Sequence, residues 1–182
     1  MPEQINSAVI DKSKNRLYNT VMINCSTKER NLDEFYMNSA IKLAEKAFDY
    51  GEVPVGALIV CDGEIIASAY NRRESDKNAL RHAEIMCIDR ACRALGGWRL
   101  HKCTLYVTLE PCPMCAGAIV NSRIKRVVFG AYDSRAGAFG SLMNFNSYPL
   151  NHKPEICGGI LEDECRSLMQ RFFARLREKR KK

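Results

Sequence analysis

The spacing of apolar positions changes twice between residues 33 and 70. From Asp33 to Gly51 the apolar residues recur every three to four positions, which predicts a helix with Asp33 as its N-cap. Two apolar runs follow at 55–61 and 64–70, and only Asp62-Gly63 separates them. Because both residues of this dipeptide tolerate positive φ, the pattern predicts two strands joined by a tight hairpin turn.

The rest of the chain alternates between helical and extended patterns. The predicted elements are a helix from about His82 to Leu95 ended by Gly96-Gly97, a strand at 104–108, a helix that has Pro111 in its first turn and runs to about Asn121, a strand at 126–129, and a terminal helix from about Glu162. This order predicts an α/β sandwich in which helices cover a mixed sheet. The strand–helix–strand order from 104 to 129 favours a parallel, right-handed crossover.

The chain divides into an extension and one domain. Residues 1–32 are polar and show no sustained periodicity, so we expect a poorly ordered N-terminal extension there. Residues 33–182 contain no internal repeat and no Pro/Gly-rich linker, and 150 residues suit a single domain. The domain should therefore run from residue 33 to the C-terminus.

Positive charge is concentrated at the C-terminal end. The net charge is +7, but residues 171–182 hold seven Lys/Arg and one Glu, which leaves a net charge of +1 for the other 170 residues. A basic terminal helix can attract a polyanion, either a nucleic acid or an acidic membrane surface. It can equally be a solvated segment that aids solubility, so charge alone leaves both interpretations open.

Cysteine usage and hydropathy indicate an intracellular protein. Nine cysteines is an odd number, and the N-terminus lacks the long apolar core of a secretory signal, which argues against a disulfide framework. The longest nearly apolar stretch, 53–61, is nine residues long and cannot span a bilayer. We therefore predict a cytoplasmic protein that does not insert into a membrane, with most of its cysteines packed as small apolar residues.

Two of the cysteines form a metal-binding pattern together with a distant histidine. Cys112 and Cys115 are spaced i, i+3 at the start of a predicted helix, so both sulfur atoms can reach one ion. His82 begins another predicted helix, and an imidazole with two thiolates is a favourable ligand set for zinc. Two helix N-termini that face each other would bring the three ligands together. The same ligands also accept iron or cobalt in vitro.

The number of ligands favours a catalytic site. Three protein ligands leave the fourth tetrahedral position for water, whereas a structural site is closed by a fourth ligand, and no second CxxC pair occurs. Glu84, two residues after His82, can stand beside that water without binding the metal. Zinc lowers the pKa of bound water and a nearby carboxylate can transfer its proton. The competing interpretation is a partial structural zinc site or a chance pattern, but a structural site needs a fourth ligand, and His101 and His152 are isolated histidines typical of the surface or the core.

Longer motifs around these residues resemble one family. The His-x-Glu and Pro-Cys-x-x-Cys motifs are the signature of zinc-dependent nucleobase deaminases. The matching segments are Glu52–Gly56, His82–Met86, Trp98–Leu100, Thr104–Cys112, Met114–Ala118, Ser122–Ile124, Arg126–Gly130 and Gly140–Met143. In that order, and over about residues 33 to 177, they resemble the bacterial tRNA-specific adenosine deaminases.

The resemblance implies a fold, a reaction and a set of site residues. It implies a three-layer α/β/α cytidine-deaminase-like sandwich that works as a homodimer with one Zn2+ per subunit. The reaction is the hydrolytic deamination of adenosine to inosine at the wobble position of a tRNA anticodon, A34 of an arginine tRNA, with zinc-activated water. By motif position His82, Cys112 and Cys115 correspond to the zinc ligands and Glu84 to the proton shuttle. Asn71 resembles the base-contacting asparagine, and Asp133 resembles an aspartate beside the bound nucleotide.

Physical arguments agree with this reaction but leave two other functions open. An anticodon-loop base is unpaired, so extruding it costs little. The basic terminal helix, with Phe172 and Phe173, offers phosphate contacts and one ring to RNA, although both rings can also be packing residues. The alternatives are a zinc deaminase of free bases or nucleotides and a zinc-stabilised RNA-binding module without catalysis. The basic helix favours the tRNA enzyme over the first, and Glu84 favours an enzyme over the second.

Overall fold

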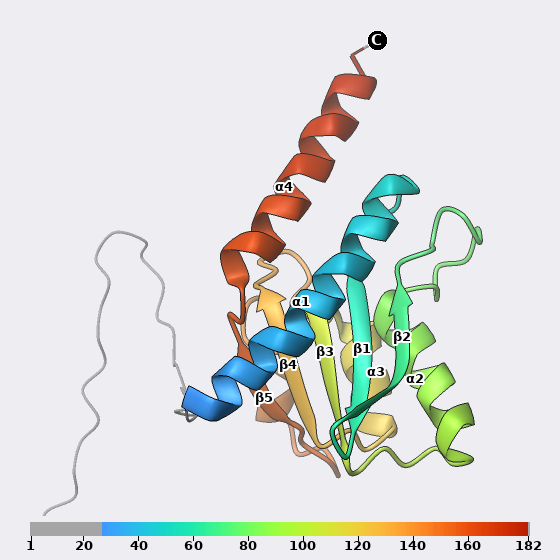
Figure 1. The fold of residues 1–182 in the computed structure, drawn as a ribbon, viewed down its shortest axis with the longest axis vertical. Coiled ribbons are helices and arrows are strands. Elements are labelled where there is room, and N and C mark those ends of the chain that lie inside the picture. Colours follow the sequence, from blue (N-terminus) through green and yellow to red (C-terminus); the bar gives the residue numbers. More distant parts are fainter. Residues whose placement is uncertain (1–26, 182) are drawn as a thin grey trace, which may run out of the picture.

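The computed structural model describes residues 27–181, which form a five-stranded sheet between helices (Figure 1). In chain order the elements are α1 (Thr27–Asp49), β1 (Gly56–Cys61), β2 (Glu64–Tyr70), α2 (Ala83–Leu95), β3 (Cys103–Leu109), α3 (Pro113–Asn121), β4 (Arg126–Ala131), the 3-10 helix η1 (Phe145–Ser147), β5 (Glu155–Gly158) and α4 (Glu162–Lys179).

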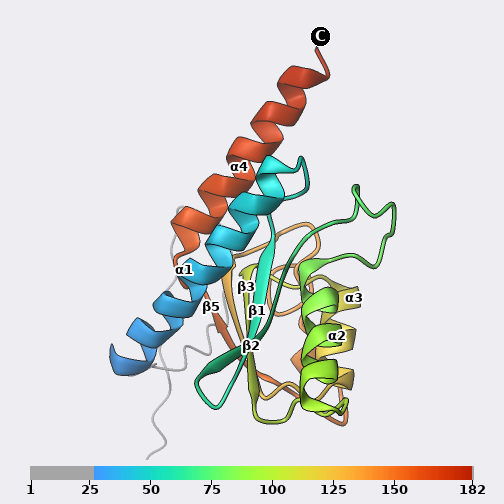
Figure 2. The same ribbon diagram turned by 45° about the vertical axis from the view of Figure 1, so that its right-hand side comes forward.

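The elements form three layers. The strand order is β2-β1-β3-β4-β5; β1 pairs antiparallel with β2 and β3, whereas β3, β4 and β5 run parallel. Helices α1 and α4 cover one face of the sheet and α2 and α3 the other (Figures 1 and 2). The predicted α/β/α sandwich with a mixed sheet is therefore confirmed, as is the parallel connection between β3 and β4.

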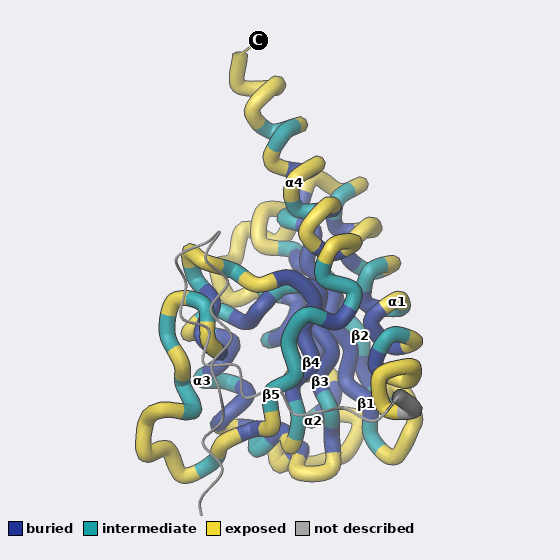
Figure 3. Tube along the Cα trace, turned by 90° about the vertical axis from the view of Figure 1, so that its left-hand side faces the viewer, coloured by how far each residue is buried: buried dark blue, intermediate teal, exposed yellow. Residues whose placement is uncertain are grey.

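Successive side chains of a strand point to opposite faces of the sheet, so the strands contribute to two hydrophobic cores, one on each face. Ile59, Leu105 and Val127 point to the side of α2 and α3, whereas Leu58 and Val128 join the core under α1 and α4. The central strands β1, β3 and β4 are buried on both faces, while the edge strands β2 and β5 are partly exposed and the far end of α4 is exposed (Figure 3). At Gly56 a Cβ atom would collide with the backbone of α1, so the absence of a side chain lets this helix lie directly on β1.

Two local predictions are confirmed by backbone geometry. Asp62 and Gly63 have φ of 49° and 85°, the positive values that a tight hairpin turn between β1 and β2 requires. Gly96 has a left-handed conformation, and the capping backbone N–H groups donate to the carbonyls of Arg93 and Cys92, which ends α2 as the Gly96-Gly97 pair predicted.

Three local predictions are wrong. Helix α1 begins at Thr27, so Asp33 lies inside the helix, where its buried carboxylate binds Arg126 and Tyr106 instead of capping. Helix α3 begins at Pro113, because Cys112 precedes a proline and is held extended at φ −73° and ψ 170°. Strand β5 was not predicted; it has four residues and no alternating pattern, and it forms along the edge of β4.

The expected boundary at residue 33 falls inside α1. The predicted disorder of the N-terminal extension concerns chiefly residues 1–26, which lie outside the described residues. In the part of the chain that the structure describes, none of the helices combines the length and apolar character that crossing a membrane requires.

Candidate metal centre and active site

Several of the predicted site residues lie at one edge of the sheet. Strands β2, β3 and β4 run in the same direction, so they all end at the edge where β1 begins. Asn71 follows β2, Cys112 follows β3 by three residues, and Asp133 follows β4 by two. Ligand sites in α/β proteins characteristically form at the carboxyl ends of such strands, where loops are free of the sheet.

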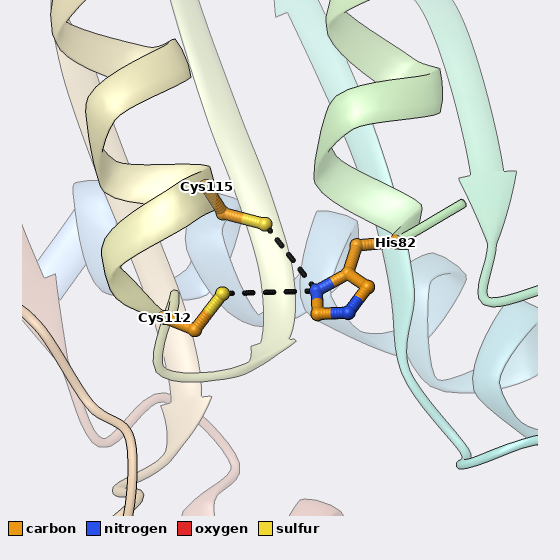
Figure 4. Close-up of side chains that lie close together, drawn as sticks. All are labelled: His82, Cys112 and Cys115. Atoms are coloured by element: carbon orange, nitrogen blue, oxygen red, sulfur yellow. Dashed lines mark hydrogen bonds between the residues drawn. The ribbon is translucent and has the colours of Figure 1, made fainter. Parts of the chain in front are cut away.

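The predicted metal ligands occupy the starts of two helices. His82 is the N-cap of α2 and Cys112 the N-cap of α3; both have extended backbones, and their carbonyls accept the first helical hydrogen bonds, from Met86 and Ala116. Cys115 lies in the first turn of α3, so its side chain is on the same end as that of Cys112. The prediction that two helix N-termini face each other is confirmed (Figure 4).

The three side chains converge on one point. The His82 Nδ1 atom lies 3.7 Å from the Cys112 Sγ atom and 3.6 Å from the Cys115 Sγ atom. All three ligand atoms lie within 4.8 Å of one another, and they make up the single cluster of this kind among residues 27–181. One imidazole nitrogen and two sulfur atoms, with no fourth ligand in the cluster, suit Zn2+ in an open, catalytic coordination.

The two thiols influence each other strongly. A hydrogen bond with Cys115 lowers the pKa of the Cys112 thiol to about 4, and His82 acts in the same direction. That hydrogen bond raises the pKa of the Cys115 thiol, and burial adds to the effect. The hydrogen bond with Cys112 also raises the pKa of His82. A thiolate is thus favoured at Cys112 by protein groups alone, which is the protonation state that a metal ion needs.

Glu84 lies beside the cluster in a nearly dry environment. It occupies the first turn of α2, is only 4% exposed, and has no place in the metal-ligand cluster. Burial raises the pKa of its carboxyl group, while the neighbouring His82 opposes that shift. A buried carboxyl group with a raised pKa holds a proton more readily than an exposed one, which suits a general acid/base.

Asn71 is buried and held by an acidic neighbour that sequence reasoning did not single out. Its side-chain nitrogen donates to Glu52 at 3.3 Å, and its backbone N–H donates to Val55 at 2.9 Å. The fully buried Glu52 also accepts the backbone N–H groups of Glu74 and Ser75, at 3.1 and 2.6 Å. Glu52 therefore fastens the loop that leads to His82 and orients the amide of Asn71.

Asp133 closes a turn at the end of β4. Its carboxylate accepts the backbone N–H groups of Arg135 at 2.9 Å and Ala136 at 3.3 Å. Its own backbone N–H donates to Glu110 at 3.1 Å. Asp133 is thus half-buried at the same edge of the sheet as Asn71 and Cys112, and its side chain organises the loop that follows.

Glu110 is the second buried carboxylate that the sequence alone did not reveal as important. It precedes Pro111-Cys112 and accepts the backbone N–H groups of Phe139 at 2.9 Å and Ser141 at 3.1 Å, together with the Ser141 hydroxyl group. It joins the metal-ligand segment to the 133–141 loop. The sequence feature that could have revealed Glu110 is its position directly after a largely buried strand, because a buried carboxylate there needs several hydrogen-bond partners.

The basic end of α4 and the other histidines lie outside the cluster. The guanidinium groups of Arg171 and Arg175 lie 5.8 and 5.5 Å from the ring centre of Phe48. Phe172 is buried against Phe48, whereas Phe173 is exposed, so one of the two phenylalanines is a core residue.

His152 contacts the carbonyl of Ile124 at 2.7 Å, and neither it nor His101 joins the metal-ligand cluster.

The fold and the three-ligand centre define a class, the zinc-dependent hydrolytic deaminases. Residues 30–131 match the family model described as the cytidine and deoxycytidylate deaminase zinc-binding region, which is more than half of the chain, and the protein belongs to this family. The predicted Zn2+ cofactor is confirmed by this match together with the geometry of the cluster.

Within this family the chain is similar to tRNA-specific adenosine deaminases. It is 55% identical to the one from Bacillus subtilis over 150 residues, covering 82% of this chain and 93% of that protein. It is 45% identical to the one from Haemophilus influenzae over 151 residues, 82% of this chain and 87% of that protein. A solved structure from studies of A-to-I editing by tRNA:A34 deaminases is 42% identical with a TM-score of 0.71, covering 74% of this chain and 98% of that one. The resemblance seen in the motifs is thereby confirmed.

Proposed function

We propose that this protein converts adenosine to inosine at the wobble position, nucleotide 34, of a tRNA anticodon. The observation that carries this proposal is the buried Glu84 beside an open His82–Cys112–Cys115 centre, in a chain 55% identical to a tRNA-specific adenosine deaminase. Adenosine and water give inosine and ammonia, so the reaction requires proton transfers but no redox cofactor.

His82, Cys112 and Cys115 hold the zinc ion. When bound, zinc supplies a Lewis acid that activates a water molecule for attack on C6 of the adenine. Glu84 takes up the proton that this water gives away and delivers protons to ring nitrogen N1 and to the departing amino group. The raised pKa of its carboxyl group suits a residue that must carry the proton between these steps.

Two residues at the same edge of the sheet orient the nucleotide. Because Glu52 accepts a hydrogen bond from the side-chain nitrogen of Asn71, the amide is held in one orientation, ready to bond to an edge of the base. Asp133 faces the nucleotide from the loop after β4, which Glu110 ties to the segment that carries Cys112. The basic residues of α4 bind phosphate groups of the anticodon stem-loop.

The finer features of the proposal follow from the family resemblance. The substrate is an arginine tRNA, the working form is a homodimer with one zinc ion per subunit, and the location is the cytoplasm. Leu95 and Trp98, at the end of α2, are about half exposed, which supports an apolar contact between subunits. Sedimentation or light scattering at several protein concentrations tests the dimer directly.

One experiment separates the proposal from its competitors. The zinc-loaded protein is incubated in parallel with tRNA, cytidine and guanine, and ammonia release is measured for each. Ammonia from tRNA alone, with inosine at nucleotide 34 found by sequencing, supports the proposal, and the tRNA species that carries inosine identifies the substrate. Ammonia from cytidine or guanine alone indicates an enzyme of free bases or nucleosides. Binding of tRNA without any ammonia indicates an RNA-binding module.

A further inference from the structure

Two tyrosine rings lie together where α1 and β2 end. The rings of Tyr50 and Tyr70 are nearly parallel, with an interplanar angle of 8° and ring centres 6.1 Å apart. Two cations flank them: the Lys46 Nζ atom lies 5.3 Å from the centre of the Tyr70 ring, and the Arg72 guanidinium lies 6.0 Å from it. Arg72 also donates a hydrogen bond to the Tyr70 hydroxyl group at 3.4 Å. We call these four residues the tyrosine platform.

The tyrosine platform adjoins the segment of the candidate active site that carries Asn71. Tyr70 and Arg72 flank Asn71 in sequence, and Asn71 is bonded to Glu52, two residues after Tyr50. The ends of α1 and β2 lie at the same end of the molecule as the loop that leads into α2 (Figures 1 and 2). The basic side of α4 adjoins as well, because Arg171 and Arg175 lie over Phe48 of α1.

The exposure of Tyr50 distinguishes this group from ordinary packing. Its side chain is 64% exposed, far more than a residue that fills a core, and its ring lies parallel to that of Tyr70, which two cations flank. Exposed aromatic rings interleaved with Lys and Arg are the arrangement on which proteins stack single-stranded bases, since the ring holds the base and the cation holds the phosphate. Arg72 is also paired with Asp76 at 2.8 Å, which offsets its charge, so Lys46 is the main source of positive charge in the tyrosine platform.

We propose that the tyrosine platform binds the unpaired base that neighbours the target adenosine in the anticodon loop, with Tyr50 stacking on that base. This inference rests on the proposed function. When the target base enters the site, it leaves the stack of its neighbours, and a neighbouring base then loses one stacking partner. Tyr50 replaces that partner, while Lys46 contacts the adjoining phosphate and Arg72, held by Asp76, supports the ring of Tyr70.

The test uses an RNA anticodon stem-loop with the fluorescent base 2-aminopurine on either side of adenosine 34. Stacking on a ring quenches this fluorophore, so the wild-type protein should quench it at one of the two positions. Tyr50→Ala should abolish that quenching and lower kcat/KM for inosine formation about 5- to 100-fold, mainly through KM, because one base–aromatic stack is lost. Tyr50→Phe keeps the ring and should restore both values.

Phe35→Ala is the matched control. Phe35 is 63% exposed on the same helix but lies 15 residues earlier, about 22 Å along the axis, so its removal should change neither quenching nor kcat/KM. Lys46→Gln should reduce the slope of log binding constant against log salt by about 0.7, whereas Tyr50→Ala should leave that slope unchanged. These two variants separate stacking from charge.

The outcomes distinguish the two proposals. If the wild-type protein forms no inosine in the stem-loop, the proposed function fails. If the wild type forms inosine but Tyr50→Ala matches it in kcat/KM and in quenching, the tyrosine platform is refuted while the proposed function stands. A loss of activity shared by Tyr50→Ala and Phe35→Ala also refutes it, because the effect would then not depend on position.

Discussion

Arg126 on β4 donates two parallel hydrogen bonds to Asp33 on α1, 2.7 and 2.8 Å long, across 93 residues of sequence. Tyr106 of β3 donates a third to the same carboxylate at 2.9 Å. The Asp33 carboxylate is nearly inaccessible, so it is held by three donors from two neighbouring strands. Helix α1 is thereby fixed in position over the centre of the sheet.

This relationship predicts a large effect on stability. Asp33→Ala leaves Arg126 partly buried without its carboxylate, and breaking a buried pair from one side typically costs about 3–5 kcal/mol; the lower end applies because Arg126 is 20% exposed. Urea unfolding followed by circular dichroism measures this loss. Glu34→Ala removes the exposed pair with Arg30 on the same helix and should cost less than about 1 kcal/mol. Equal losses in the two variants would contradict the buried-pair argument.

The metal centre can be tested by removing single ligands. Cys112→Ala and Cys115→Ala should each lose zinc and activity together, and should lower the melting temperature, because metal binding stabilises the folded state. Zinc content is measured by mass spectrometry of the metal after dialysis. Cys92→Ala, a cysteine outside the cluster, should keep full zinc content. Full zinc occupancy in both ligand variants would refute the assignment.

Removing Glu84 separates chemistry from binding. Glu84→Ala keeps His82, Cys112 and Cys115, so zinc content and tRNA affinity should stay near normal. Turnover should fall about 10²- to 10⁴-fold, which is the usual contribution of a general acid/base. Glu84→Gln should be nearly as inactive, because the amide keeps the shape but cannot accept the proton. The hypothesis is falsified if Glu84→Ala retains near-normal deamination of tRNA, or if its activity falls only because zinc is lost.

The basic end of α4 should govern the salt dependence of tRNA binding. Residues 175–182 contain six Lys/Arg and one Glu, and those that the structure describes, 175–181, are exposed apart from the half-buried Leu176. Deleting this segment should weaken tRNA binding and flatten the dependence of log binding constant on log salt, because fewer counterions are released. Replacing the six cations with Gln preserves the length and tests charge alone. Unchanged affinity and slope in both variants would identify the segment as an aid to solubility.

Gly137 should be intolerant of a side chain. A Cβ atom at this position would collide with the Glu110 carboxylate and with the backbone of Asp133. Gly137→Ala should therefore displace the 133–141 loop and lower kcat/KM for tRNA, with a loss of stability of about 1–3 kcal/mol. Gly117→Ala is the contrasting variant, because nothing lies within 4 Å of its Cβ position and alanine favours a helix. A Gly137→Ala protein with normal activity and stability would show that the loop is adaptable.

Local patterns in the sequence determined most of the secondary structure and the chemistry of the site. Asp62-Gly63 between two apolar runs predicts the hairpin, and Gly96-Gly97 predicts the end of α2, because both depend on backbone conformations that few residue types adopt. The Cys112–Cys115 spacing predicts two ligands on one helical turn. A metal site with one imidazole and two thiolate ligands follows from these residue types, whereas zinc as its metal and deamination as the reaction rest also on the family resemblance.

Only the tertiary structure decided how distant residues cooperate. His82 reaches two cysteines that lie 30 and 33 residues later because the sheet sets α2 beside α3. Asp33 resembles an N-cap in sequence, but its real partners, Arg126 and Tyr106, are supplied by strands that pack under α1. Glu52 and Glu110 accept hydrogen bonds from backbone N–H groups of loops that lie 22 to 31 residues later in the chain. Such contacts depend on chain topology, whereas propensity and spacing describe neighbours along the chain, so no local pattern could reveal them.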